Sequence, residues 1–105
     1  MVLVSVANAD IERIRRGERV AVRLPADIRR TGMSHIPAVI TNLSITGFHM
    51  QAEERLKPGS RIWVRLGSLA PLMAQVVWVD AYCAGCAFSQ PLHPAILDHI
   101  VGAAG

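Results

Sequence analysis

The chain has 105 residues, of which 51% are hydrophobic and 18% are charged, and its net charge is +3. This length fits one domain, and the high apolar and low charged content excludes a disordered chain. The opening MVLVSV is too short for the apolar region of a signal peptide, and no segment approaches the roughly 18 apolar residues of a membrane span. We therefore expect a soluble cytoplasmic protein with no membrane insertion and with reduced cysteines.

The charge is unevenly distributed, because arginines gather in the first 30 residues. They are Arg13, Arg15, Arg16, Arg19, Arg23, Arg29 and Arg30, offset there by Asp10, Glu12, Glu18 and Asp27. A basic segment of this kind suits an anionic partner such as a nucleotide, a nucleic acid or an acidic surface. The alternative is a charged N-terminal arm that is simply solvated.

The first half of the chain predicts three strands. Alternation from Val20 to Leu24 indicates a half-buried strand with Pro25 near its end, and the polar stretch 27–35 is interpreted as a break. IPAVITNLS, residues 36–44, has the β-branched character of a second strand. FHMQA, residues 48–52, alternates as a short third strand after the NLSITG turn.

The second half predicts three more strands and one helix. RIWVRL alternates over residues 61–66, LMAQVVWVD at 72–80 is the longest β-rich run, and AYCAGCAF at 81–88 is expected to pair with it. From Pro94 the apolar residues recur at helical spacing. This order predicts a mainly all-β fold: a small six-stranded antiparallel barrel with a C-terminal helix over about 93–102.

No enzyme signature is found. In CAGC, Cys83 and Cys86 fall within a predicted strand, where residues three apart point to opposite faces, and no second CxxC completes a zinc site. The sequence lacks GxSxG, HExxH, Walker and Rossmann motifs. The four histidines lie on different elements, and His93, just before Pro94, is interpreted as part of a helix N-terminus. We therefore predict no catalytic residues, no metal site and no cofactor.

Two short polar segments carry side chains that could bind a ligand without catalysis. In RRGER, Arg15 and Arg19 present planar guanidinium groups that bind phosphate and guanine edges. In NLSITG, Asn42 offers an amide, Ser44 a hydroxyl and Gly47 either a positive φ or a close approach. Each segment also has a structural interpretation, the first as a charged arm and the second as a polar turn.

Together these segments resemble the PilZ domain, a family of bacterial cyclic di-GMP receptors whose hallmarks are RxxxR and [D/N]xSxxG. The resemblance implies that Arg15 and Arg19 grip the guanines and phosphates of the ligand from a flexible N-terminal arm, and that Arg16 adds a phosphate contact. It further implies that Asn42 and Ser44 meet the ligand from the barrel surface, where Gly47 keeps the turn close. These six residues are the predicted binding site: Arg15, Arg16, Arg19, Asn42, Ser44 and Gly47.

The resemblance also implies a mechanism. We expect residues 1–12 to form the arm and 13–105 the barrel domain, with ligand binding ordering the segment up to about Arg19 and signalling to a downstream protein. Many members carry two adjacent arginines at the start of the first motif, whereas Ile14 precedes Arg15 here, which leaves the number of bound ligands open.

Two other functions are compatible with parts of the sequence. One is a non-binding adaptor of the same fold in a pilus or motility system, against which the intact motifs count. The other is a barrel that binds single-stranded nucleic acid, which would use exposed stacking aromatics. The chain has five aromatic residues, several of them in predicted core strands, so a nucleic acid polymer is not the expected partner.

Overall fold

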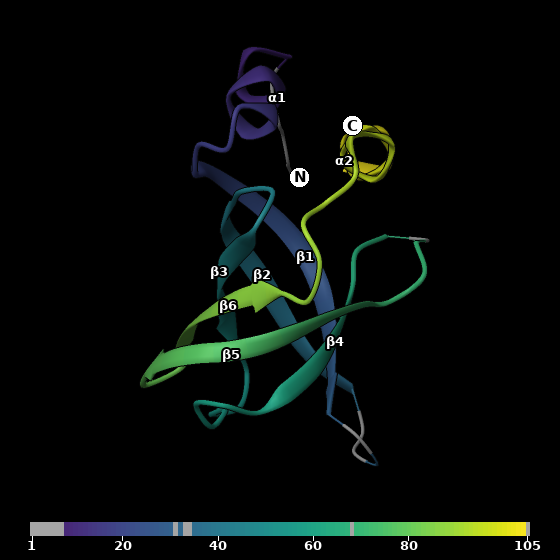
Figure 1. Ribbon diagram of the computed structural model, residues 1–105. Helices are drawn as coiled ribbons and strands as arrows, with labels where there is room; N and C mark the ends of the chain where they lie inside the picture. Colours follow the sequence, from purple (N-terminus) through teal and green to yellow (C-terminus); the bar gives the residue numbers. More distant parts are fainter. Residues whose placement is uncertain (1–7, 31, 33–34, 68, 105) are drawn as a thin grey trace.

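The computed structural model describes residues 8–30, 32, 35–67 and 69–104, which form a small barrel with two helices (Figure 1). In chain order the elements are α1 (Asn8–Arg15), β1 (Val20–Arg30), β2 (His35–Leu43), β3 (Gly47–Ala52), β4 (Arg61–Arg65), β5 (Leu72–Asp80), β6 (Cys83–Phe88) and α2 (Pro94–Ala104). None of the described helices is long and apolar enough to cross a membrane.

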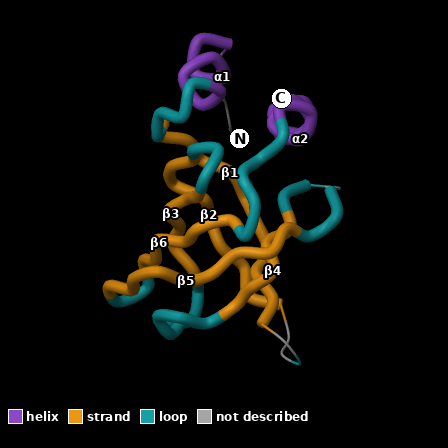
Figure 2. Tube along the Cα trace, viewed as in Figure 1, coloured by secondary structure: helices purple, strands orange, loops and turns teal. Residues whose placement is uncertain are grey.

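The six strands close into one antiparallel barrel in the order β1-β2-β3-β6-β5-β4. Each strand pairs with its two neighbours in this order, so β1 and β4 complete the closure. Figure 2 shows both helices at the same end of the barrel, where α1 contacts α2. The predicted mainly-β barrel with a C-terminal helix is confirmed.

The core lies inside the barrel and continues beneath the helices. Alternate residues of the strands point inward, as in β4, where Ile62 and Val64 are fully buried between exposed arginines. Leu97 of α2 and Ile14 of α1 are also buried against this core. The two helices therefore cover one end of the barrel with apolar side chains.

Helix α1 was not predicted. Its sequence NADIERIR is mostly polar, and its apolar contribution comes from Ile11 and Ile14, which are three residues apart and so share one helical face. Ile14, noted above as the departure from a second adjacent arginine, is fully buried. Ile14, which stands where many family members have a second arginine, thus anchors α1 to the core.

The predicted break at 27–35 is wrong at both ends, because β1 continues to Arg30 and β2 begins at His35. Asp27 and Arg29 are outward residues of the strand, alternating with buried Ile28. Pro25 lies within β1 rather than near its end. It is tolerated there because the pairing of β1 with β4 begins only at Asp27, so Pro25 has a strand neighbour on one side.

Candidate ligand-binding site

A row of four residues crosses four neighbouring strands on the outer face of the barrel. Asn42 of β2 pairs in register with His49 of β3, His49 with Gly85 of β6, and Gly85 with Trp78 of β5. These four residues, called here the cross-strand row, bring together positions that are up to 43 residues apart in sequence. Only strand pairing could assemble them.

Two irregularities in the strands create this alignment. The register between β2 and β3 shifts between Ile40 and Asn42, and that between β5 and β6 shifts between Val76 and Trp78. Each shift inserts one extra residue, Thr41 or Val77, and such bulges commonly re-aim the side chain beside them. They place Asn42 opposite His49 and Trp78 opposite Gly85.

Asn42 is the centre of a hydrogen-bond chain. Its Oδ1 accepts from Arg19 Nη1 at 2.8 Å and from the backbone N–H of His49 at 3.1 Å. Its Nδ2 lies 2.6 Å from His49 Nδ1. The two predicted segments are therefore joined directly, because Arg19 belongs to one and Asn42 to the other.

His49 is held between this amide and an indole. Its ring meets the ring of Trp78 edge-on, with centroids 5.0 Å apart and an interplanar angle of 77°. Burial, and secondarily the positive charge of Arg19, lower the pKa of His49 from its usual value. The imidazole is therefore neutral at pH 7.

Ser44 is buried, and its hydroxyl is used inside its own turn. Ser44 Oγ accepts from the backbone N–H groups of Thr46 and Gly47, each at 3.2 Å, and lies 3.3 Å from the carbonyl of Gly47. The backbone N–H of Ser44 also donates to that carbonyl at 2.9 Å. These contacts fix the turn that leads into β3, as expected of a serine that closes a local side-chain turn.

Two glycines allow close approaches on this face. A Cβ on Gly47 would lie 2.3 Å from the backbone oxygen of Cys86, and a Cβ on Gly85 would lie 2.1 Å from Trp78 Nε1. Gly47 is thus required for the spacing of β3 and β6, rather than for a positive φ. Gly85 lets the indole of Trp78 pack directly against the backbone of β6.

Beside the cross-strand row lies a hollow of about 210 Å³. It is lined by His49, Gly85 and Trp78 of the row, together with Gly47 and Arg19. Trp78 is 41% exposed, so part of its ring is open to a ligand. The hollow combines a guanidinium, an imidazole and an aromatic surface, a combination suited to a flat anionic molecule such as a nucleotide.

The segment from Arg15 to Arg19, called here the arginine segment, leads from α1 into β1. Its Gly17 has a φ of 91° and ends the helix: the N–H of Gly17 donates to Ile14 O at 2.9 Å, and that of Glu18 to Arg13 O at 3.0 Å. This pair of bonds defines a Schellman motif. Since α1 ends at Arg15, Arg15 and Arg19 do not share a helical face.

The arginines of this segment have different partners. Arg15 contacts Glu12 on its own helix at 3.4 Å and also contacts Asp98 of α2. Arg16 lies 3.6 Å from Glu18 and is exposed. Arg19, unlike these two, contacts the barrel motif, through Asn42.

A family comparison agrees with this geometry. The PilZ domain model matches residues 13–103, nearly the whole chain. The chain belongs to the PilZ domain family. PilZ domains are cyclic di-GMP receptors rather than a catalytic family, although some do not bind the nucleotide. A search of curated proteins finds no match.

Within this PilZ domain, the six predicted residues fall into three groups. Arg19 and Asn42 are in contact, and Gly47 lines the adjoining hollow. Ser44 supports the turn from inside, while Arg15 and Arg16 are paired with carboxylates away from the hollow.

His49, Trp78 and Gly85 were not predicted as site residues from the sequence. A glycine inside a predicted strand is a signal for a close approach, and Gly85 carried that signal, but its partner could not be identified without the register. His49 and Trp78 were assigned to strands with no role at the site.

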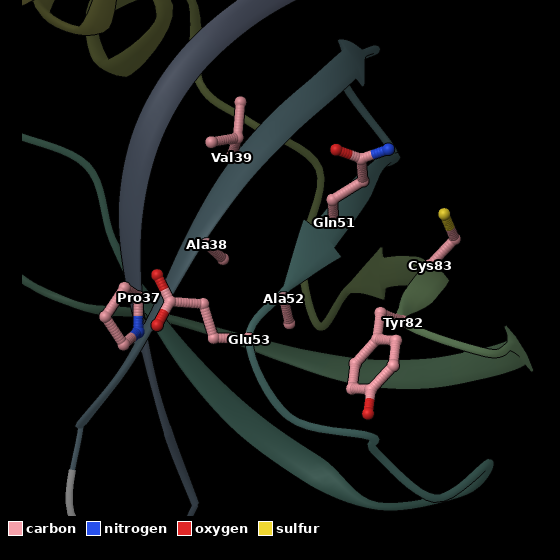
Figure 3. A pocket seen from close by; sticks show the side chains of 8 residues that line it. All are labelled: Pro37, Ala38, Val39, Gln51, Ala52, Glu53, Tyr82 and Cys83. Carbon is pink, nitrogen blue, oxygen red and sulfur yellow. The ribbon is translucent and has the colours of Figure 1, made fainter.

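Cys83 and Cys86 are free thiols, and burial raises the pKa of Cys86 to about 12, so it stays protonated. No cluster of metal-ligating side chains occurs among the described residues. A separate hollow of about 340 Å³ runs from Pro37 and Glu53 to Tyr82 (Figure 3), and it contains none of the six predicted residues.

Proposed function

We propose that this PilZ domain binds cyclic di-GMP at the hollow beside the cross-strand row. The observation that carries the proposal is the 2.8 Å hydrogen bond between Arg19 and Asn42, because it joins the two family motifs at the edge of that hollow. Cyclic di-GMP is a dianion with two guanines, so it calls for cationic forks and for hydrogen-bonding groups at the base edges.

Each side chain at the hollow has a part in this proposal. The Arg19 guanidinium binds a phosphate or a guanine edge, and the Asn42 amide contributes a polar contact from the barrel. The exposed indole of Trp78 offers an apolar surface beside the bases. Ser44 and Gly47 contribute by keeping the turn in place, since the hydroxyl of Ser44 is already engaged there.

Arg15 and Arg16 would join the ligand by exchanging partners. Both are held by exposed carboxylates, and exposed ion pairs of this kind are weak. We propose that the phosphates replace Asp98 and Glu18 as partners of these arginines. The arginine segment would then be ordered over the hollow, and the new surface would be available to a downstream protein.

Ile14 limits how far this ordering extends. Because its side chain is fully buried, the motion we propose is centred on Arg15 to Arg19 and does not require α1 to leave the core. Hydrogen exchange of residues 10 to 20 should slow at saturating ligand. Unchanged exchange would contradict the ordering step and leave the binding proposal standing.

Calorimetric titration with cyclic di-GMP tests the binding site. Arg19→Ala should abolish measurable binding, while the thermal transition of the free protein shifts little because Arg19 is exposed. Arg65→Ala is the matched control, since Arg65 is an exposed arginine on β4, outside the residues that line the hollow. Equal losses in both variants would indicate general charge attraction rather than this site.

Two further titrations set the ligand class. GTP and a short single-stranded oligonucleotide should bind much more weakly than cyclic di-GMP at the same salt concentration. If the unmodified chain binds none of the three, the proposal is wrong and a non-binding interaction module becomes the better description.

A further inference from the structure

The hydrogen-bond chain at Asn42 fixes the protonation state of His49. A guanidinium and a backbone N–H can only donate, and both face Asn42 Oδ1, at 2.8 Å and 3.1 Å. This atom must therefore be the amide oxygen. The amide nitrogen then faces His49 Nδ1 at 2.6 Å and can only donate to it. His49 Nδ1 must accept, so the ring hydrogen is on Nε2.

We infer that His49 is a positioning residue: as the neutral Nε2–H tautomer it fixes the orientation of the Asn42 amide, and its protonation releases that amide and weakens ligand binding. The effect on binding rests on the function proposed above. The effect on the amide does not.

Protonation acts on three contacts at once. An imidazolium carries hydrogen on both nitrogens, so Nδ1–H would face the Asn42 NH₂ group, donor against donor. Turning the amide over would repair that contact, but it would aim the NH₂ group at Arg19 and at the backbone N–H of His49. No orientation of Asn42 satisfies all three neighbours once His49 is charged.

The surroundings of His49 favour the neutral ring. Asn42 from β2 and Trp78 from β5 are uncharged, and Arg19, from the segment before β1, is positive. From β6, Cys86 lines the hollow; its thiol is buried in the core, and its pKa of about 12 keeps it neutral. None of the described residues lining the hollow is a carboxylate.

These surroundings set the sign of the pH dependence. Burial and Arg19 place the pKa of His49 below the usual value of 6.5. His49 is therefore neutral at pH 7 and becomes protonated as the pH falls below about 6.5. The added positive charge by itself favours a dianion, so the inferred loss of ligand affinity in that acidic range requires the release of the Asn42 amide to outweigh this attraction.

Two isosteric variants separate this role from simple packing. His49→Asn places an amide oxygen near the position of Nδ1, so it can accept from Asn42, whereas His49→Leu has nearly the same shape and no acceptor. Both remove the ring contact with Trp78 and both remove the titrating group. They differ in the amide group, whose oxygen is the acceptor that faces Asn42.

Calorimetry with cyclic di-GMP at about pH 7.5 and about pH 5 measures the consequence. At the higher pH, His49→Asn should bind nearly as the unmodified protein does, and His49→Leu should bind about five- to tenfold more weakly, the effect of one net hydrogen bond. Between the two pH values the unmodified protein should lose affinity relative to His49→Asn. Equal affinity of the two variants, or parallel pH profiles of the unmodified protein and His49→Asn, would overturn the inference.

Nitrogen NMR of the free protein provides a test without any ligand. The His49 ring should show hydrogen on Nε2 and none on Nδ1, with a pKa below 6.5. Asn42→Asp should reverse this pattern, because a carboxylate accepts from Nδ1–H and stabilises the imidazolium, which raises the pKa. An Nδ1–H tautomer in the unmodified protein would refute the positioning role. If His49 carries its hydrogen on Nε2 as inferred but the protein binds no cyclic di-GMP, only the proposed function is refuted.

Discussion

The two parts of the candidate site are held in place by different kinds of interaction. The cross-strand row and the turn from Ser44 to Gly47, together called the platform, are set by strand pairing and by buried or half-buried hydrogen bonds. The arginine segment is set by ion pairs at the surface, such as that between Arg15 and Asp98, whose side chains are 40% and 56% exposed.

This difference predicts different responses to mutation. Exposed ion pairs contribute about 0 to 1 kcal/mol each and can be exchanged for a ligand at little cost. Strand register and steric approach cannot change without disturbing the barrel. Changes in the platform should therefore affect folding as well as binding, and changes in the arginine segment should affect binding alone.

Gly47→Ala should give the largest effect, because its Cβ would lie 2.3 Å from the backbone oxygen of Cys86. A backbone oxygen within a strand pair has little freedom to move, so β3 and β6 must separate there. We expect the free energy of unfolding to fall by about 3 kcal/mol, measured by urea denaturation. Gln51→Ala, an exposed change on the same strand, should alter it by less than about 0.5 kcal/mol. A small effect of Gly47→Ala would mean that the platform is less rigid than its strand pairing indicates.

Gly85→Ala should have a smaller effect, because the added Cβ would meet the Trp78 side chain rather than backbone. The indole is partly exposed and can swing away from β6, so we expect a loss of roughly 1 to 2 kcal/mol. Because the indole would then no longer line the hollow, Gly85→Ala should also weaken cyclic di-GMP binding.

A double-mutant comparison isolates this contact. In a Trp78→Ala background, Gly85→Ala should be nearly neutral in stability, because the indole that it displaces is already absent. A cost that is the same in both backgrounds would show that Gly85 is needed by the strand itself and has no part in placing Trp78.

The contrast between the two parts also explains how much the sequence could predict. Alternation located the strands, as at Ile62 and Val64, and the motifs indicated the family and assigned Arg19 and Asn42 to one predicted site. Their direct hydrogen bond was not predicted. The cross-strand row was beyond this reasoning, because the bulges at Thr41 and Val77 shift the register. Regular alternation puts Val77 and Trp78 on opposite faces, yet both are exposed.

The errors at the N-terminal side have a related cause. The polar residues of 27–30 were interpreted as a break, although in β1 they alternate with inward side chains. Helix α1 escaped detection because it is short and mostly polar, and the apolar residues that it is seen to pack on the core are Ile11 and Ile14. Its stability depends on tertiary packing, which composition does not reveal.

The smallest expected effect concerns the arginine segment. Asp98→Asn keeps the shape of the side chain and weakens its pairing with Arg15. Because both side chains are exposed, the free energy of unfolding should change by less than about 1 kcal/mol. If Arg15 must leave Asp98 to reach a phosphate, Asp98→Asn should tighten cyclic di-GMP binding by about threefold, since only a weak surface pair is removed.

Removing a carboxylate also makes the protein more positive, which by itself favours a dianion. Asp80→Asn, the same change at an exposed position at the end of β5, measures that general contribution. Combining Asp98→Asn with Arg15→Ala measures the specific one, because without Arg15 there is no pair to break. A gain that persists without Arg15, or that Asp80→Asn reproduces, would mean that Asp98 does not compete with the ligand. A gain in affinity that requires Arg15 would show that α2 restrains the arginine segment through Asp98 until a phosphate of the ligand replaces that carboxylate.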